Sequence, residues 1–282
     1  DRLLKSPANQ RGRDFAVMLQ SLNNLGYAIE WRVINAAEYG MPQRRRRIFF
    51  IGYHKSTKVY KTLKKSNKVD WLISDGTIST VFPVKKLNYL QEFKLEGDLV
   101  EITSKFNTNG KISPFLNTGL MIDGRIYTVK TIANFKGEKT TLGEILQKEE
   151  INSKFYIDES DRKKWEYLKG AKKEKRITKS GFEYNYSEGR MIYPDALDNA
   201  SRTIITGEGG KSPSRFKHVV DSCKGLRRLT PIELERLNMF PDNHTKLEDI
   251  SDAKRAFFMG NALVVGIIQK IGLSLQDKIW SI

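Results

Sequence analysis

The chain has 282 residues, 39% of them hydrophobic, which suffices for one large or two modest folded domains and excludes a mainly disordered protein. Lys and Arg number 49 against 33 Asp and Glu, and the net charge of +16 is typical of proteins that meet phosphate backbones, although a lysine-rich protein without such a partner would look the same. One cysteine and three scattered histidines exclude a disulfide framework and a cysteine-rich zinc site, and they favour an intracellular compartment.

The first elements are a helix and two strands. Apolar side chains lie at helical spacing in residues 11–25, namely Phe15, Met18, Leu19, Leu22 and Leu25. Gly26 follows them, so the pattern predicts an amphipathic helix that stops there. Residues 27–36 and 46–54 read as strands, and their short connection predicts an antiparallel pair at the edge of an otherwise parallel sheet.

The middle of the chain, residues 55–200, predicts a separate, irregular and basic module. It holds short strand candidates in residues 124–135 and a charged helix in residues 158–170. Residues 161–190 contain ten Lys or Arg against five acids, with five aromatic residues among them. This mixture suits phosphate contacts and base stacking, and it suits a solvated charged face over a small core equally well.

Two helices are predicted near the end. Thr230, Pro231 and Glu233 form the pattern of a capping box with proline at the first helical position. Further on, Gly260 suits a tight turn and Asn261 the N-cap of an apolar helix that closes the chain. A helix N-terminus approached by glycine can also receive a polar ligand, although that signal alone is weak.

Four consecutive arginines, residues 44–47, stand directly before the second apolar strand. Like charges beside an apolar run cost free energy, so an anionic or electron-rich ligand would explain them. If the segment is extended, Gln43, Arg45 and Arg47 share one face. That face can aim planar guanidinium donors at a carbonyl or phosphate oxygen. The alternative is a basic strand edge that bonds only its own loops.

Four segments occur in the order and with the character of the later motifs of bacterial restriction-modification DNA (cytosine-5) methyltransferases, which the chain thereby resembles. They are residues 39–53 (YGMPQRRRRIFFIGY), 201–218 (SRTIITGEGGKSPSRFKH), 227–244 (RRLTPIELERLNMFPDNH) and 257–265 (FFMGNALVV). The resemblance implies an α/β fold: the C-terminal part of a Rossmann-like, S-adenosylmethionine-dependent methyltransferase sheet, with a smaller, irregular, mostly β target-recognition domain. The implied division is 1–75 for the catalytic part, 76–225 for target recognition, 226–252 for a hinge segment, and 253–282 for a terminal helix returning to the catalytic domain.

Three motifs of that family are not found in the sequence: the Pro-Cys-Gln motif with the nucleophilic thiol, the glycine-rich loop for S-adenosylmethionine, and the base-contacting ENV motif. The chain begins at Asp1 with sequence like that which follows ENV. The resemblance therefore implies a C-terminal half, inactive alone, whose partners are double-stranded DNA and a polypeptide with the N-terminal catalytic half. No metal and no membrane are expected.

The resemblance also implies roles for particular residues. Arg47 would contact the oxygen O2 of a flipped-out cytosine, while Arg45 and Gln43 would order the loop and neighbouring phosphates. Gly260, Asn261 and Ala262 would complete the S-adenosylmethionine pocket, or simply cap a helix. The implied DNA contacts are Arg202, Thr206, Glu208, Gly209, Gly210, Lys211, Ser212 and Arg215. The alternative for the glycine-rich segment 206–215 is an ordinary flexible turn.

Two positions depart from a simple match. Met239 stands where the family usually has glycine, which puts a left-handed helix cap there in doubt. Cys223 lacks the Pro-Cys-Gln context, so we expect a small, semi-buried residue rather than the nucleophile. A competing function is a non-catalytic, sequence-specific DNA-binding or regulatory subunit whose arginine site no longer meets a cytosine.

Overall fold

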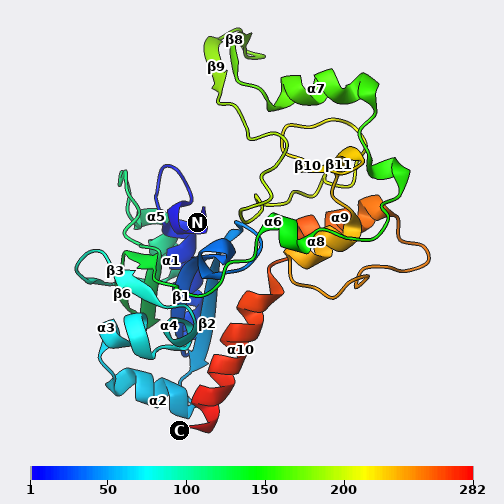
Figure 1. Ribbon diagram of the computed structural model, residues 1–282. Coiled ribbons are helices and arrows are strands. Elements are labelled where there is room, and N and C mark those ends of the chain that lie inside the picture. The colour runs from blue at the N-terminus through cyan, green and yellow to red at the C-terminus, as the bar shows by residue number, and fades with distance from the viewer. Residues whose placement is uncertain (1, 282) are drawn as a thin grey trace. The chain divides into compact units, whose positions relative to one another are not determined.

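The computed structural model describes residues 2–281, which form two compact units (Figure 1). Unit 1 comprises Asp1–Gly40, Arg45–Glu138 and Ile267–Ile282, and unit 2 comprises Met41–Arg44 and Lys139–Gly266. These units differ from the predicted division, because unit 1 extends to residue 138 and also includes most of the last helix. The physical reason is that strands between residues 84 and 133 pair within unit 1 instead of forming a separate module.

The first elements of unit 1 confirm the sequence pattern. A short 3-10 helix η1 (Leu3–Lys5) precedes α1 (Arg13–Asn24), and Gly26, with a φ of +83°, ends the helix as predicted. Strands β1 (Tyr27–Asn35) and β2 (Arg46–His54) are antiparallel, joined through the 3-10 helix η2 (Ala36–Tyr39).

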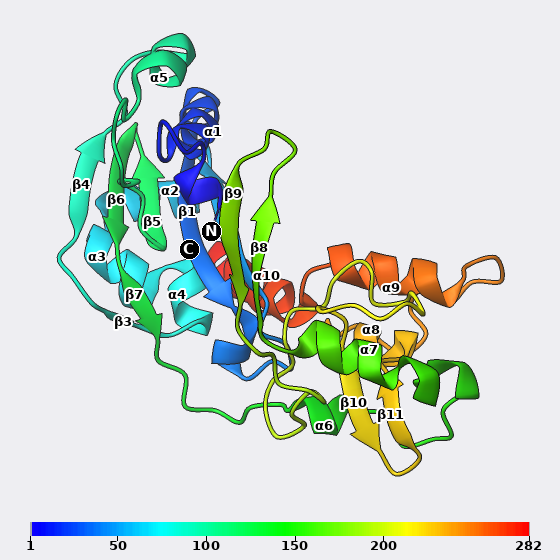
Figure 2. The same ribbon diagram turned by 90° about the horizontal axis from the view of Figure 1, so that it is seen from above.

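The main sheet of unit 1 has five strands in the order β2-β1-β5-β6-β4 (Figure 2). Its further strands are β4 (Gln91–Lys94), β5 (Thr118–Ile122) and β6 (Arg125–Val129), while β3 (Val84–Lys86) pairs with β7 (Thr131–Ala133). All of these pairs are antiparallel, so the expected parallel sheet is not what residues 2–281 form. The turn between β5 and β6 shows why: Asp123 and Gly124, both with positive φ, make a two-residue hairpin that reverses the chain at once.

Helices cover both faces of this sheet. Helix α1 packs through Phe15, whose ring lies 5.2 Å from Trp31 in an edge-on contact, and Gly119 leaves the room that the indole occupies. Toward the other face, Ser274 of α10 donates to the Thr77 carbonyl at 2.8 Å. The remaining helices of unit 1 are α2 (Lys58–Lys65), α3 (Lys68–Asp70), the π-helical turn η3 (Trp71–Asp75), α4 (Thr77–Val81) and α5 (Leu99–Lys105), and α10 (Val265–Trp280) begins in unit 2.

Unit 2 is built from short elements around a small apolar core that includes Ile204, Val220, Leu229 and Leu234. The predicted capping box of Thr230 and Glu233 is confirmed at the start of α8. The charged helix predicted in residues 158–170 is confirmed as α7 (Glu159–Lys169). The elements of unit 2 are α6 (Leu142–Ile145), η4 (Ser153–Phe155), α7 (Glu159–Lys169), β8 (Lys172–Ile177), β9 (Glu183–Glu188), β10 (Val219–Ser222), β11 (Gly225–Arg228), α8 (Pro231–Leu237) and α9 (Asp252–Asn261).

The last two helices differ from expectation. Gly260 and Asn261 are the final residues of α9, and α10 begins only at Val265, so the predicted turn at Gly260 and N-cap at Asn261 are wrong. Gly260 packs there against the chain at Thr206, where a Cβ would lie 2.4 Å from backbone atoms, so the glycine serves a close approach within α9 rather than a turn. Within residues 2–281 no single helix is long and apolar enough to cross a membrane; only the bent pair α9 and α10 meets that test together, by length and composition.

Met239 keeps the left-handed turn that its side chain put in doubt. Its φ is +61°, its N–H donates to the Arg236 carbonyl at 2.9 Å, and Phe240 N–H donates to the Glu235 carbonyl at 3.0 Å. These two bonds form a Schellman motif after α8. A non-glycine residue in this conformation costs about 1–2 kcal/mol.

We therefore expect Met239→Gly to stabilise the protein, by about 0.5–1 kcal/mol, because relief of the left-handed strain exceeds the added entropy of the unfolded glycine. Thermal unfolding should show a midpoint a few degrees higher. Met239→Ala keeps the Cβ and is the matched control. A stability gain for the alanine variant equal to that for glycine would contradict this account.

Candidate functional site

Gln43 is fully buried at 0% exposure and anchors the arginine run. Its Nε2 donates to Asn238 Oδ1 at 2.9 Å and to the Leu237 carbonyl at 3.2 Å. Its Oε1 accepts from Ile204 N–H at 3.1 Å. We call residues 206–215 the recognition loop. The Gln43 side-chain amide therefore connects the start of the arginine run to the end of α8 and to the segment that precedes the recognition loop.

The backbone beside Gln43 reinforces this anchor. Ser201 N–H donates to the Pro42 carbonyl and Arg44 N–H donates to the Ser201 carbonyl, both at 2.8 Å, which makes a single parallel bridge between two distant segments. The arginine run thus starts from a fixed position within unit 2.

Arg45 and Arg47 differ in exposure. Arg45 lies just before β2 and is buried, and burial followed by the nearby charge of Arg47 lowers the pKa of Arg45 to about 10. Arg47 lies in β2 opposite Ile34 and is exposed, with Nη1 donating to the Arg46 carbonyl at 2.8 Å. Arg47 is therefore the guanidinium of this pair that a ligand can reach.

Glu208 points into the protein at 3% exposure. Its Oε1 lies 2.9 Å from His218 Nδ1, its Oε2 accepts from His218 N–H at 3.0 Å, and His218 Nε2 lies 3.0 Å from Ser201 Oγ. Burial raises the pKa of Glu208, but the charge and hydrogen bonds of His218 outweigh it and leave that pKa below its usual value. The Glu208 carboxylate is thus bonded within the protein and holds the recognition loop.

Arg202 also bonds inward. Its Nε and Nη2 form a two-point ion pair with Asp195 at 2.6 and 3.0 Å, and its Nη1 donates to the Phe216 carbonyl at 3.1 Å. Lys169 is buried nearby and donates to the Lys217 carbonyl. Burial, with a smaller contribution from the charge of Arg202, lowers the pKa of Lys169 to about 8.

Arg215 binds the ends of a neighbouring hairpin. Its Nη1 donates to the carbonyls of Leu168 and Gly170 at 2.9 and 3.0 Å, and its Nη2 donates to the Gly189 carbonyl at 2.5 Å. Glu188 lies 3.3 Å away as an ion-pair partner. The guanidinium is thus occupied by protein groups, which the sequence pattern does not reveal.

The outward residues of the recognition loop are Thr206, Lys211 and Ser212, all exposed. Lys211 also lines a polar cavity of about 340 Å³ that includes Arg228. Gly209 serves packing, because a Cβ there would lie 2.6 Å from Ala253 Cα in α9. The lack of a side chain at Gly210 matters less, since its nearest neighbour would be the flexible end of Lys217, at 2.9 Å.

The predicted cofactor residues lie together at the end of α9. Gly260 is required by its close approach to Thr206, so its role in this structure is packing. Asn261 is exposed, with Nδ2 donating to the Phe257 carbonyl at 3.1 Å, and Ala262 follows as the helix cap. The amide oxygen of the exposed Asn261 side chain is thereby available to a ligand.

Sequence reasoning missed two groups. His218 and Asp195 organise the recognition loop; His218 lies inside a recognised segment, while Asp195 carries no sequence signal.

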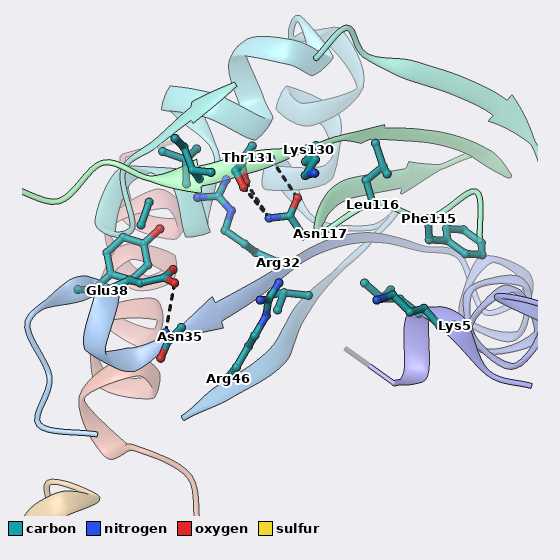
Figure 3. A pocket seen from close by; sticks show the side chains of 16 residues that line it. Lys5, Arg32, Asn35, Glu38, Arg46, Phe115, Leu116, Asn117, Lys130 and Thr131 are labelled. Carbon is teal, nitrogen blue, oxygen red and sulfur yellow. Dashed lines mark hydrogen bonds between the residues drawn. The ribbon is translucent and has the colours of Figure 1, made fainter. Parts of the chain in front are cut away.

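A cavity of about 620 Å³ in unit 1 was also missed (Figure 3). Buried Arg32 lies at its wall and donates to the Phe82 carbonyl at 2.7 Å, while Arg46 and Lys130 add positive charge. Within residues 2–281 no group of three or more His, Cys, Asp or Glu could hold a metal ion.

Cys223 lies in the turn between β10 and β11 and is exposed, so the expectation of a semi-buried residue is wrong. The turn leaves it outside because Ser222 pairs with Gly225 and closes the hairpin beneath it.

Glu208→Gln should destabilise the protein by about 1–3 kcal/mol, because the amide NH2 would face backbone or imidazole N–H donors. Chemical unfolding at pH 7 measures this, with exposed Glu248→Gln as control. Since the pKa of Glu208 is lowered in the folded protein, its stabilisation is present above the pKa of the unfolded chain and is lost as the pH falls through the folded pKa. The difference from wild type should therefore shrink in acid; a constant difference would contradict the ionised pairing.

Comparison with known proteins gives the family. The family model described as C-5 cytosine-specific DNA methylase matches residues 2–277. Type II methyltransferase M.Sau3AI of Staphylococcus aureus is 43% identical over 98% of this chain and 65% of its own length. Type II methyltransferase M.HpaII of Haemophilus parainfluenzae is 23% identical over 96% of this chain and 57% of its own length. The S. pombe Dnmt2 methyltransferase structure, at 14% identity, aligns with a TM-score of 0.47 over 91% of this chain and 58% of that chain.

The chain thus spans less than two thirds of the length of these curated relatives. The comparisons support the expected family, and they do not support the narrower expectation of a C-terminal half, since the family match extends along residues 2–277. With that match and 43% identity to the S. aureus relative, the chain belongs to the C-5 cytosine-specific DNA methylases.

Proposed function

We propose that this chain provides target recognition and the base-contacting arginine in methyl transfer from S-adenosylmethionine to C5 of a cytosine in a specific DNA site. The observation that carries this proposal is the exposed Arg47 guanidinium at the start of β2, where Arg47 is paired with Ile34 and Nη1 donates to the Arg46 carbonyl at 2.8 Å. A preorganised donor of this kind can act on a charge that develops in the transition state.

The chemistry explains the use of an arginine. When a thiolate adds to C6 of cytosine, electron density moves onto N3 and O2, and a guanidinium that donates to O2 stabilises this state more than the ground state. The base must first leave the duplex, because stacked neighbours block the approach to C5 and C6. Arg47 is the group we assign to O2.

The DNA contacts follow from exposure. Thr206, Lys211 and Ser212 face outward on the recognition loop and are the groups we assign to base edges and phosphates. Glu208 and Arg202, whose charged groups bond within the protein, we assign to holding that loop. Arg215 belongs with them.

Enzymes of this family use S-adenosylmethionine, which supplies the electrophilic methyl group. The residues present fit a small share of such a pocket: Gly260 and Ala262 supply backbone, and the exposed Asn261 side chain supplies an amide oxygen. We propose that Asn261 contacts the methyl donor.

The nucleophile needs a separate source. The sequence contains no Pro-Cys-Gln, and its one cysteine lies in an exposed hairpin turn. We propose that methyl transfer requires a polypeptide that carries the Pro-Cys-Gln, glycine-rich and ENV motifs. A second candidate function is that of a non-catalytic DNA-binding subunit. The absence of Pro-Cys-Gln from the sequence also favours it. The two functions differ in one expectation: in a non-catalytic subunit, substitution of Arg47 would not affect methyl transfer.

Transfer of labelled methyl groups from S-adenosylmethionine to DNA tests this function. Neither this chain nor a polypeptide with the three motifs should transfer methyl groups alone, and a mixture of the two should. Robust transfer by this chain alone would contradict the need for a second source of the thiol. A mixture that binds DNA and yet transfers nothing would favour the non-catalytic alternative.

Arg47→Ala should lower methyl transfer by that mixture about a hundredfold or more, the usual scale for losing one preorganised donor. DNA affinity should change little. Arg47→Lys keeps the charge without the planar fork and should recover only part of the rate. Full turnover by Arg47→Ala would show that the assignment to O2 is wrong.

Cys223→Ser should leave DNA binding, methyl transfer by the mixture, and the unfolding midpoint nearly unchanged, because an exposed thiol in a turn contributes little packing. Loss of transfer with an unchanged midpoint would identify Cys223 as the nucleophile and would overturn the proposal that the thiol comes from elsewhere.

A further inference from the structure

The hairpin of β8 and β9 projects from the end of α7, away from the core elements of unit 2 (Figure 1). Its residues are exposed or half-buried on both faces, and Phe182 near its tip is 67% exposed. A two-stranded ribbon without a covering layer is only marginally stable in water. A chain that builds such a ribbon leaves two faces available for a partner.

The two faces of this ribbon differ in charge balance. One face carries Arg176, which pairs with Glu174 at 3.1 Å and lies 3.4 Å from the centre of the Tyr186 ring. Lys172, on the same face, lies over the Tyr167 ring at 4.6 Å. The charged groups of this first face are therefore engaged within the protein.

The second face carries Lys173 and Lys175, which lie opposite Ser187 and Asn185 in the register of the hairpin. Within residues 2–281 no hydrogen bond or ion pair forms to either lysine side chain. Ile177 and Glu183, which are paired with each other, lie on the same face. This face, which we call the lysine face, therefore carries two lysines against one acid and offers amide and hydroxyl groups to solvent.

Arg215 fixes the direction of the ribbon. Its donors bind carbonyls at both ends, at Gly170 before β8 and at Gly189 after β9, and its charge pairs with Glu188 in β9. Because Arg215 itself ends the recognition loop, one guanidinium joins the ribbon to that loop. The two elements are thereby held as one body within unit 2.

A two-stranded ribbon fits the major groove of B-DNA, which is about 12 Å wide. Lysines suit the phosphates that line the groove, and an asparagine amide can pair with adenine through two hydrogen bonds. We propose that the β8–β9 ribbon enters the major groove with its lysine face toward the DNA, where Lys173 and Lys175 bind phosphates and Asn185 reads a base. Arg215 is the positioning residue that sets its angle.

This inference rests on the proposed function, because it requires that the chain bind duplex DNA. Binding of the full chain to a fluorescent pool of random-sequence duplexes, measured by anisotropy at several salt concentrations, tests it. The double variant Lys173→Ala/Lys175→Ala should reduce the slope of log affinity against log salt by about 2, because each lysine that binds a phosphate adds about one to that slope. Lys61→Ala/Lys65→Ala on α2 removes the same charge and should leave the slope unchanged.

The outcomes separate the two proposals. If the wild-type chain does not bind duplex DNA, the proposed function fails. If the wild type binds with a strong salt dependence and the ribbon variant behaves like the α2 control, the ribbon proposal alone is wrong. An equal reduction of the slope in both double variants would also overturn it, since the effect would then be one of net charge.

Base reading has its own measurement. Duplexes selected by the chain from the random pool should lose preference at one base pair in Asn185→Ala, with the salt slope kept. Arg215→Ala should broaden the preference about tenfold or more, and Arg215→Lys should not restore it, because an ammonium cannot reach both ends of the hairpin. Circular dichroism of each variant is the control that it is folded. An unchanged selected sequence in Asn185→Ala would contradict base reading, and restoration by lysine would contradict the positioning role.

Discussion

The burial of the Gln43 amide is the constraint on which the candidate site depends. Its three hydrogen bonds connect the start of the arginine run, the segment before the recognition loop and the end of α8, which lie up to 195 residues apart in sequence. A buried amide left without its partners costs about 1–3 kcal/mol, so each of these segments must be in place before any one of them is stable there. The start of the arginine run, up to Arg44, is thus held by distant parts of unit 2, while Arg47 itself lies in β2, opposite Ile34 in β1.

Buried ion pairs extend the same logic to the rest of unit 2. Arg227 binds Glu233 at 2.7 Å and Arg255 binds Glu235 at 2.9 Å. Such pairs add little net stability, because desolvation offsets much of the attraction, but removing one partner costs about 3–5 kcal/mol. Their effect is to exclude alternative arrangements. A small core made of short elements could pack in several ways, and these pairs leave one of them without an unpaired charge.

The sequence predicts well what neighbouring residues decide. Helix α1, the β1–β2 pair and the capping box of α8 depend on periodicity, a glycine stop and residues three apart, all of which are local. The two compact units differ from the predicted division, because pairing of β5 with β1 joins residues about 90 apart, which no local pattern indicates. The orientation of the site residues is likewise not a local property: a pattern of polar residues in a glycine-rich loop cannot show that Glu208 and Arg215 bond within the protein, since their partners are His218 and the carbonyls at the ends of a hairpin.

This inward turn changes how the motif is understood. A loop that recognises DNA bases must tolerate substitutions that change its target sequence. It must also be rigid enough in structure to discriminate between bases. Assigning the buried charges to the protein and the exposed Thr206, Lys211 and Ser212 to the ligand satisfies both needs, because the exposed groups can vary without disturbing the anchors. The close packing of Gly209 and Gly260 at the α9 contact serves the rigid part. Glycine in this motif therefore meets a need of packing inside the protein as well as any need for close approach to a ligand.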